Sequence, residues 1–162
     1  VAVIGGGNSG FETAIFLSNY VNRIYILEYG SQPKADKENQ ERVSKIENCQ
    51  VITNAQLKKI EGENFVEAIV YQDNKTKEKK DIKTEGVFVE IGYQPATAFV
   101  KGLVKFNKRD EIEVECETCQ TKTPGLYAVG DANVGKFKQI VTAAGEGAKA
   151  ALSSYNYIQD IK

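Results

Sequence analysis

The stretch VAVIGGGNSGFETAIFL, residues 1–17, decides the fold of this chain. Residues 1–4 are a short β-branched run that ends in three consecutive glycines, which predicts a strand followed by a tight turn. A helix is expected over residues 8–20, because Phe11, Ala14, Ile15 and Leu17 recur at helical spacing. RIYILE at residues 23–28 predicts a second, parallel strand. Together these segments form a βαβ unit, the building block of a Rossmann-like α/β domain.

The segments that follow extend this α/β pattern. We expect a polar helix over 36–47, strands at 49–53 and 55–60, a hairpin of 65–73 and 77–85 around Asn74, a buried strand within 86–97, another strand at 125–131, and the longest helix over 138–158. Gly92 and Pro95 interrupt the strand within 86–97, which places a soft domain boundary near residue 90. The predicted domains are therefore residues 1–90 and 91–162.

The glycines of the opening turn fit the pattern G-x-G-x-x-G between a strand and a helix, at Gly5, Gly7 and Gly10. The first allows the tight turn, the second lets the main chain approach a pyrophosphate, and the third lets the helix pack close to the strand. Amide groups at the start of the helix, where Asn8 and Ser9 lie, would face the phosphate charge. The pattern predicts a dinucleotide-binding turn, and the alternative is a glycine-rich turn without a ligand.

Glu28 ends the second strand, 18 positions after Gly10. A carboxylate at this place accepts hydrogen bonds from both ribose hydroxyls of NADH and repels the 2′-phosphate of NADPH, whereas NADPH sites place an arginine nearby. The following residues, YGSQPKAD at 29–36, contain no arginine. NADH is therefore favoured over NADPH, and Gly92 is assigned to the same site. The alternative is that Glu28 is only a solvated strand end.

Composition argues against several other classes of function. A net charge of −1 with interspersed signs gives no basic surface for nucleic acid or anionic membranes, and lysines within 75–83 alternate with acids as on a solvated hairpin. No apolar run reaches the roughly 20 residues that span a bilayer, and we expect a cytoplasmic protein. Histidine is absent, which excludes Ser–His and Cys–His pairs within these residues and removes the commonest zinc ligand, so no metal site is expected.

Six segments in order carry a resemblance to a known family: VAVIGGGNSG, ILE followed by KAD, GVFVEIGYQPAT, CET, GLYAVGD and KQIVTAAGEGAKAALS. With them the chain resembles the thioredoxin-reductase-like branch of the pyridine nucleotide–disulfide oxidoreductases, and most of all the flavoprotein subunits of alkyl hydroperoxide reductases. The resemblance covers nearly the whole chain. It implies an FAD-dependent NADH:disulfide oxidoreductase, a homodimer when intact, that passes electrons from NADH through flavin and a C-x-x-C to a peroxiredoxin or thioredoxin-like partner.

The order of domains in this family gives each half of the chain an expected role. Members run from a first flavin half through a nicotinamide domain to a second flavin half. Residues 1–90 would be the NAD(H)-binding domain, and residues 91–162 the C-terminal segment of the FAD-binding domain. The resemblance implies that the flavin's own fingerprint and the redox-active C-x-x-C lie before Val1, so this chain alone is expected to be incomplete and inactive.

FAD contacts are expected around the start of the last helix. Asp131 follows Gly130 at the end of a predicted strand, where its carboxylate could accept hydrogen bonds from the ribityl chain of FAD. The dipole of the helix that begins near residue 139 favours negative charge on reduced flavin. Glycine weakens a helix, so Gly145 and Gly147 suggest close approach of the flavin or of packed backbone. The residues assigned to FAD are Gly130, Asp131, Lys138, Gln139 and Ile140.

Cys116 and Cys119 form a C-E-T-C, but we expect no redox role for them. In the family the reactive pair precedes the nicotinamide domain, whereas this pair lies just before PGLYAVGD. The surrounding stretch is acidic, with glutamates at 111, 113, 115 and 117, and acidic neighbours do not lower a thiol pKa. The remaining cysteine, Cys49, is expected to be a small core residue at the start of a strand.

Two further functions stay open beside the disulfide reductase. One is a flavoprotein without a dithiol, like a ferredoxin–NAD(P) reductase of the same fold. The other is a non-catalytic NAD-binding module. A C-x-x-C in the residues before Val1 would favour the disulfide reductase, and its absence would favour the ferredoxin reductase.

Overall fold

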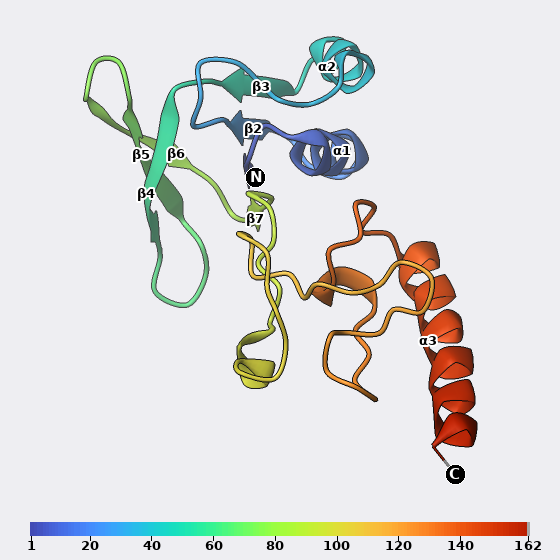
Figure 1. Cartoon of the computed structure of the whole chain (residues 1–162). Helices are drawn as coiled ribbons and strands as arrows, with labels where there is room; N and C mark the ends of the chain where they lie inside the picture. The colour runs from blue at the N-terminus through green and yellow to red at the C-terminus, as the bar shows by residue number, and fades with distance from the viewer. Residues whose placement is uncertain (162) are drawn as a thin grey trace. The chain divides into compact units, whose positions relative to one another are not determined.

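The computed structural model describes residues 1–161 and divides the chain into two compact units, Val1–Gly92 and Tyr93–Lys162. The first unit contains a four-stranded parallel sheet in the order β3-β2-β1-β7. Its strands are β1 (Ala2–Ile4), β2 (Ile24–Leu27), β3 (Cys49–Ile52) and β7 (Val87–Val89). In Figure 1 this sheet lies between helices α1 and α2 and a second, smaller sheet.

The central strand β1 is buried on both of its faces because successive side chains of a strand point to opposite sides. Val3 packs with Phe11 and the other apolar residues of the helices, whereas Ala2 and Ile4 pack with residues of the second sheet. All three β1 side chains are at most 8% exposed. A continuous apolar run is the expected sequence of such a strand, and the predicted βαβ unit and α/β fold class are confirmed.

The two helices of the first unit are shorter than expected from their patterns. Helix α1 (Asn8–Leu17) ends three residues before the predicted Tyr20, because the chain turns there: the amides of Tyr20 and Val21 both donate to the carbonyl of Leu17. Helix α2 (Lys37–Ser44) begins after Asp36 and buries Val43 against the core, with Ile46 half-buried beyond its end. Both helices pack against the same core cluster, which includes Val3 of β1 and Ile24 and Ile26 of β2.

The second sheet of the first unit is antiparallel, in the order β4-β5-β6. Its strands are β4 (Ala55–Glu61), β5 (Ala68–Asp73) and β6 (Lys79–Lys83). The hairpin predicted around Asn74 is confirmed, with a turn in which the amide of Lys77 donates to the carbonyl of Asp73. Lysines of segment 75–83 are exposed on it, as expected. Apolar side chains from this sheet close the second core cluster against β1 and β2.

The buried strand expected within residues 86–97 is wrong in extent and in burial. Strand β7 has only three residues and pairs with β1 alone, at the edge of the parallel sheet. Val89 is 57% exposed, and Gly92 turns the chain with φ of +107°. A β-branched run shows the tendency to form a strand but not its place in the sheet, and an edge strand exposes what a central strand buries.

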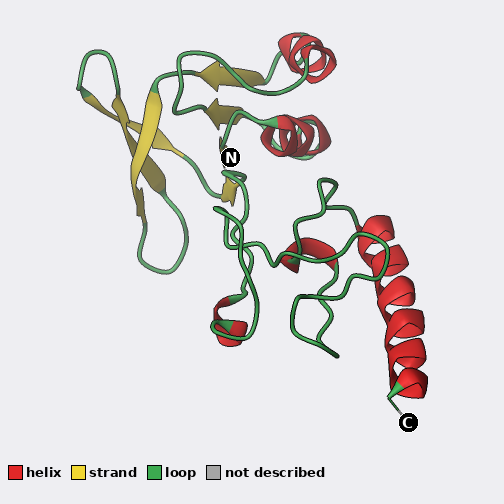
Figure 2. Ribbon diagram, in the orientation of Figure 1, coloured by secondary structure: helices red, strands yellow, loops and turns green. Residues whose placement is uncertain are grey.

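The second unit has little regular structure before its long helix, as the loops of Figure 2 show. Its elements are two short 3-10 turns, η1 (Ala98–Val100) and η2 (Gly130–Ala132), and α3 (Ile140–Asp160), which confirms the longest predicted helix. The strand expected at residues 125–131 is wrong. One isolated bridge, Gln120 to Tyr127, forms there before Gly130 turns the chain at φ of +65°, and one bridge does not make a ladder.

Candidate functional site

The carboxyl ends of three parallel strands meet at one edge of the sheet in the first unit. The register pairs Ile4 with Leu27 on one side and with Val89 on the other, so the residues just after these positions are neighbours. A cavity of about 620 Å³ opens at this edge, within the size range of ligand pockets. In open α/β sheets ligands bind beyond the carboxyl ends of the strands, which makes this cavity the candidate site.

The cavity collects most of the residues assigned from the sequence. Of these, it is lined by Gly5, Gly7, Asn8, Ser9, Glu28 and Gly92. Gly10 is the exception, because it is buried where α1 approaches β1 instead of facing the cavity. Lining residues that sequence reasoning missed include Gly6, Lys34 and Glu90. The KAD segment at 34–36 was a usable signal for Lys34, since it lies in the loop after Glu28.

The geometry of the loop explains its glycines one by one. Gly5 has φ of +124°, and a Cβ there would lie well inside 3.0 Å of the Glu90 carbonyl oxygen. At Gly10 a Cβ would collide in the same way with the carbonyl oxygen of Gly5, so α1 can approach β1 this closely only with glycine. Gly7 has open space where its Cβ would be. A ligand can therefore come close to the main chain at Gly7, where α1 begins without a side-chain cap.

Glu28 is buried and holds the glycine loop in place. Only 6% of this residue is exposed. Its Oε2 accepts a hydrogen bond from the amide of Gly6 at 2.9 Å, and its Oε1 accepts one from the amide of Gly30 at 2.6 Å. The alternative of a solvated strand end therefore does not describe this carboxylate. Each carboxylate oxygen has a second lone pair, so Glu28 can still accept hydrogen bonds from a ligand.

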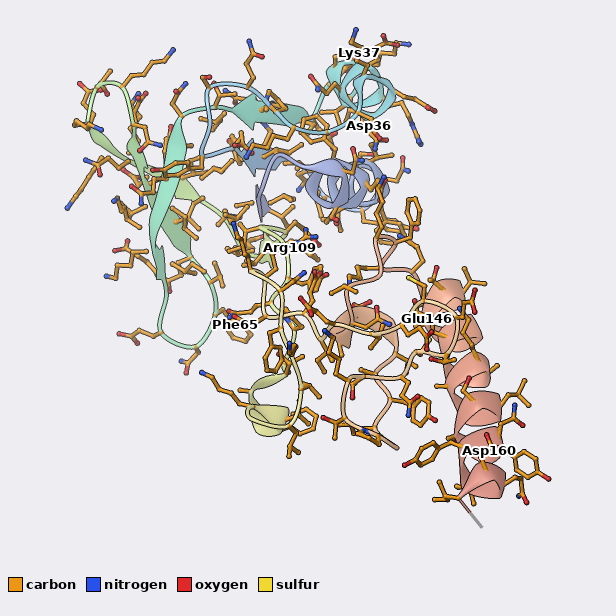
Figure 3. The ribbon with its side chains drawn as sticks, viewed as in Figure 1. Asp36, Lys37, Phe65, Arg109, Glu146 and Asp160 are labelled. Atoms are coloured by element: carbon orange, nitrogen blue, oxygen red, sulfur yellow. The ribbon has the colours of Figure 1, made fainter. Side chains whose placement is uncertain are left out.

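The loop after β2 clamps the glycine loop from the other side. The carbonyl of Gly6 accepts hydrogen bonds from the amides of Lys34 at 2.8 Å and Ala35 at 3.0 Å. The side chain of Asn8 makes a reciprocal pair with Asp36: its Nδ2 donates to Oδ2 at 2.8 Å, and its Oδ1 accepts from the backbone amide at 2.7 Å. Figure 3 labels Asp36 at the start of α2. The Asn8 side chain thus serves the loop, which leaves its backbone for a ligand.

In the second unit, Lys138 is held by internal partners. Its Nζ lies 3.3 Å from Oε1 of the buried Glu111 and donates to the carbonyls of Asp131 and Asn133. Hydrogen bonds from Asn107 and Tyr93, together with Lys138, lower the pKa of Glu111 to about 2. Lys138 therefore shapes the loop around Asp131.

The other side chains assigned to FAD differ from Lys138 in their exposure to solvent. Asp131, Gln139 and Ile140 are exposed, and α3 begins after Gln139 without a side-chain cap. A Cβ at Gly145 or Gly147 would have no neighbour within 4 Å. Backbone packing within the described residues therefore does not account for these two helical glycines.

The two cysteines of the C-E-T-C differ in their burial. Cys116 is exposed and Cys119 is buried, and burial raises the pKa of the Cys119 thiol. Among residues 1–161 no cluster of potential ligands could hold a metal ion. Within the same residues no helix has the length and hydropathy to cross a bilayer. Cys49 begins β3 and packs partly buried against the core, as expected.

A profile of the pyridine nucleotide-disulphide oxidoreductase family matches residues 1–147. The chain belongs to this family. Among curated members, the F subunit of alkyl hydroperoxide reductase in Staphylococcus aureus (strain MSSA476) is 42% identical over 158 residues, and NADH dehydrogenase of Bacillus subtilis (strain 168) is 43% identical over 158 residues. Each alignment covers 98% of this chain and 31% of the relative, so the chain spans about a third of their length.

Solved members of the family share the fold. Thioredoxin reductase of Lactococcus lactis, in its FR conformation, matches with a TM-score of 0.85 at 31% identity, covering 98% of this chain and 52% of that one. Thioredoxin reductase of T. acidophilum matches with a TM-score of 0.82 at 40% identity, covering 99% and 52%. The family implies a flavin and a nicotinamide cofactor, and the glycine loop, in which side chains at Gly5 and Gly10 would collide with backbone, has the close main-chain approach that a dinucleotide needs.

Proposed function

We propose that the first unit binds NADH, with the pyrophosphate over the loop Gly5–Gly10 and the adenosine ribose at Glu28. The observation that carries this proposal is the cavity at the carboxyl ends of the strands, lined by this loop and by a buried carboxylate. Amides at Asn8 and Ser9, at the start of α1, would stabilise the pyrophosphate charge. Asn8 and Glu28 hold the loop in shape before the coenzyme arrives.

Electrostatics of the cavity favours NADH over NADPH. Glu28 and Glu90 both line it, against one lysine, Lys34. The 2′-phosphate of NADPH would bring additional negative charge next to Glu28. Two like charges about 4 Å apart at an effective dielectric constant of about 20 repel by roughly 4 kcal/mol. Lys34 offsets part of this repulsion at most, because it is exposed to solvent.

We propose further that residues 1–90 are the NAD(H)-binding domain and residues 91–162 the second half of an FAD-binding domain. FAD, when bound, supplies the hydride acceptor. Asp131 would accept hydrogen bonds from the ribityl hydroxyls, and the start of α3 at Gln139 and Ile140 would lie near the negative side of the reduced ring. The exposure of all three residues supports this assignment.

The whole protein would then be a cytoplasmic, homodimeric NADH:disulfide oxidoreductase that serves a peroxiredoxin or thioredoxin-like protein. Relatives named alkyl hydroperoxide reductase and thioredoxin reductase support the disulfide acceptor. The dithiol would come from a C-x-x-C before Val1, since the buried Cys119 is a poor thiolate. A relative named NADH dehydrogenase favours a second candidate, an NADH-oxidising flavoprotein with a different acceptor.

A coenzyme titration tests the first proposal. NADH and NADPH are titrated separately into the purified chain, and binding is followed by the fluorescence of the reduced nicotinamide. We expect NADH to bind at least tenfold more tightly. The same experiment on Gly7→Asp, which places a carboxylate in the open space at the loop, should abolish binding of both coenzymes. Equal affinity of wild type and Gly7→Asp for NADH would contradict the assignment of the loop.

A second assay separates the two candidate activities. The full-length protein is supplied with NADH and either a disulfide-containing peroxiredoxin or an artificial dye as electron acceptor. A disulfide reductase reduces both acceptors, and alkylation of its thiols abolishes only the peroxiredoxin reaction. Dye reduction alone, insensitive to alkylation, would favour the second candidate.

A further inference from the structure

Side chains of α3 and of the loop itself fix the backbone of segment 130–135. Glu146, in the second turn of α3, accepts two hydrogen bonds with its Oε2: one from the amide of Gly130 at 2.7 Å and one from Nδ2 of Asn133 at 2.8 Å. Figure 3 labels Glu146 on α3. One carboxylate therefore binds both the first residue of the loop and a side chain from its middle.

Asn133 links Glu146 to the end of the loop through hydrogen bonds. It is 1% exposed, and its Nδ2 also donates to the carbonyl of Ala128 at 3.2 Å. Its Oδ1 accepts a hydrogen bond from the amide of Gly135 at 2.7 Å. The position of Gly135 thus depends on Asn133, whose side chain Glu146 orients.

The same loop is tight against α3 at its start. Gly130 has φ of +65°, which favours glycine, and a Cβ there would lie 3.2 Å from the Cβ of Ala143. Asp131, the next residue, is exposed. The backbone on which the Asp131 carboxylate is carried is therefore fixed, while the carboxylate itself is free to meet a ligand.

We propose that Glu146 is a positioning residue: it holds the backbone of Gly130 so that the Asp131 carboxylate is aimed at a hydroxyl-rich ligand, the ribityl chain of a flavin. This inference rests on the proposed FAD-binding role of the second unit. Charge-assisted hydrogen bonds to a carboxylate are about twice as strong as neutral ones, so Glu146 holds the loop better than an uncharged residue would. Aiming the carboxylate before the ligand binds reduces the ordering that binding requires.

The test compares Glu146→Gln and Glu146→Ala with a control, Asp160→Asn, on the exposed last turn of α3. Glutamine keeps the shape of the side chain and one acceptor oxygen. Glu146→Gln therefore still tests the inference if the loop does not fold in Glu146→Ala. In the purified chain, hydrogen exchange of the Gly130 amide, followed by NMR, should be the same in wild type and in Asp160→Asn and faster in Glu146→Gln, which loses the charge-assisted bond. Hydrogen exchange at Gly130 should speed up at least tenfold in Glu146→Ala.

The functional half of the test uses the full-length protein and FAD. We expect the dissociation constant of FAD to rise about tenfold in Glu146→Ala and by a smaller factor in Glu146→Gln, with an altered circular dichroism band of the bound flavin. Asp160→Asn should match wild type. An unchanged Gly130 exchange rate, or FAD affinity and flavin dichroism equal to the control, overturns the inference.

The two proposals fail in different ways. Wild-type protein that takes up no FAD would overturn the proposed function of the second unit. Hydrogen exchange at Gly130 would still decide whether Glu146 holds the loop.

Discussion

Replacing Gly10 by alanine tests how closely α1 approaches β1. Alanine is the best helix former and would by itself stabilise an exposed helical position by about 1 kcal/mol relative to glycine. At Gly10, however, the new Cβ would lie inside 3.0 Å of the Gly5 carbonyl oxygen and 3.5 Å from Cγ1 of Val3. Contact becomes ordinary only at 3.4 Å, and the obstacle is backbone that cannot rotate away. Helix α1 must therefore move, and overpacking of this kind destabilises by about 1–3 kcal/mol.

The matched control is the same substitution in another helix. Gly147 lies in α3 with no atom within 4 Å of its Cβ position, so Gly147→Ala should stabilise the chain by about 0.4–1 kcal/mol. Urea unfolding followed by far-UV circular dichroism gives both values. Because two units can unfold separately, native-state hydrogen exchange of the α1 amides assigns the Gly10 effect to the first unit. A Gly10→Ala protein as stable as wild type, with unchanged NADH affinity, would refute the reasoning about helix approach.

Other substitutions test single groups. Glu28→Arg should weaken NADH binding in fluorescence titrations, because it removes the acceptor of two loop amides, and it should reduce the preference for NADH over NADPH, because the charge that repels the 2′-phosphate is gone; an unchanged ratio of the two affinities would show that Glu28 does not face the ribose. Glu111 has a pKa of about 2, below its usual 4.5, so its stabilisation is full above about pH 4.5 and is lost as the pH falls toward 2. Urea midpoints of wild type and Glu111→Gln should therefore converge as the pH falls through this window, and a difference that persists at about pH 2 would contradict the assignment. Cys116→Ser with Cys119→Ser should leave disulfide reduction by the full-length protein nearly unchanged in a coupled peroxide assay, whereas near-total loss would place the dithiol here.

The local pattern of residues 1–28 was sufficient to predict the βαβ unit with which the first unit begins. Gly5 and Gly10 each have a steric reason, because a side chain there would collide with backbone, and such a reason is visible in the sequence because only glycine meets it. Hydrophobic periodicity likewise located α1, β2 and α3. Helix ends were less predictable. Helix α1 ends where the amides of Tyr20 and Val21 donate to the carbonyl of Leu17, and hydrophobic periodicity does not indicate where such a turn replaces the helix.

Errors arose where structure depends on distant partners. The run at 86–97 looks like a buried strand, but its burial depends on a neighbour on each side, and β7 has one. GLYAVGD has strand-like residues without a ladder to join. The roles of Glu28 and Glu146 as acceptors for glycine amides were also invisible, because the donors are backbone groups 22 and 16 positions away.

The two hydrogen bonds that Glu28 accepts from the glycine loop and its neighbour would constrain any change of coenzyme at the proposed site. A replacement of Glu28 that admits a phosphorylated ribose would also leave the buried amide of Gly6 and the partly buried amide of Gly30 without their acceptor, and an unsatisfied buried donor destabilises by about 1–3 kcal/mol. Evolution toward the phosphorylated coenzyme would therefore need a compensating acceptor, supplied first or simultaneously. Descendants that made that change should carry paired replacements, one at the strand end and one in the adjoining turn.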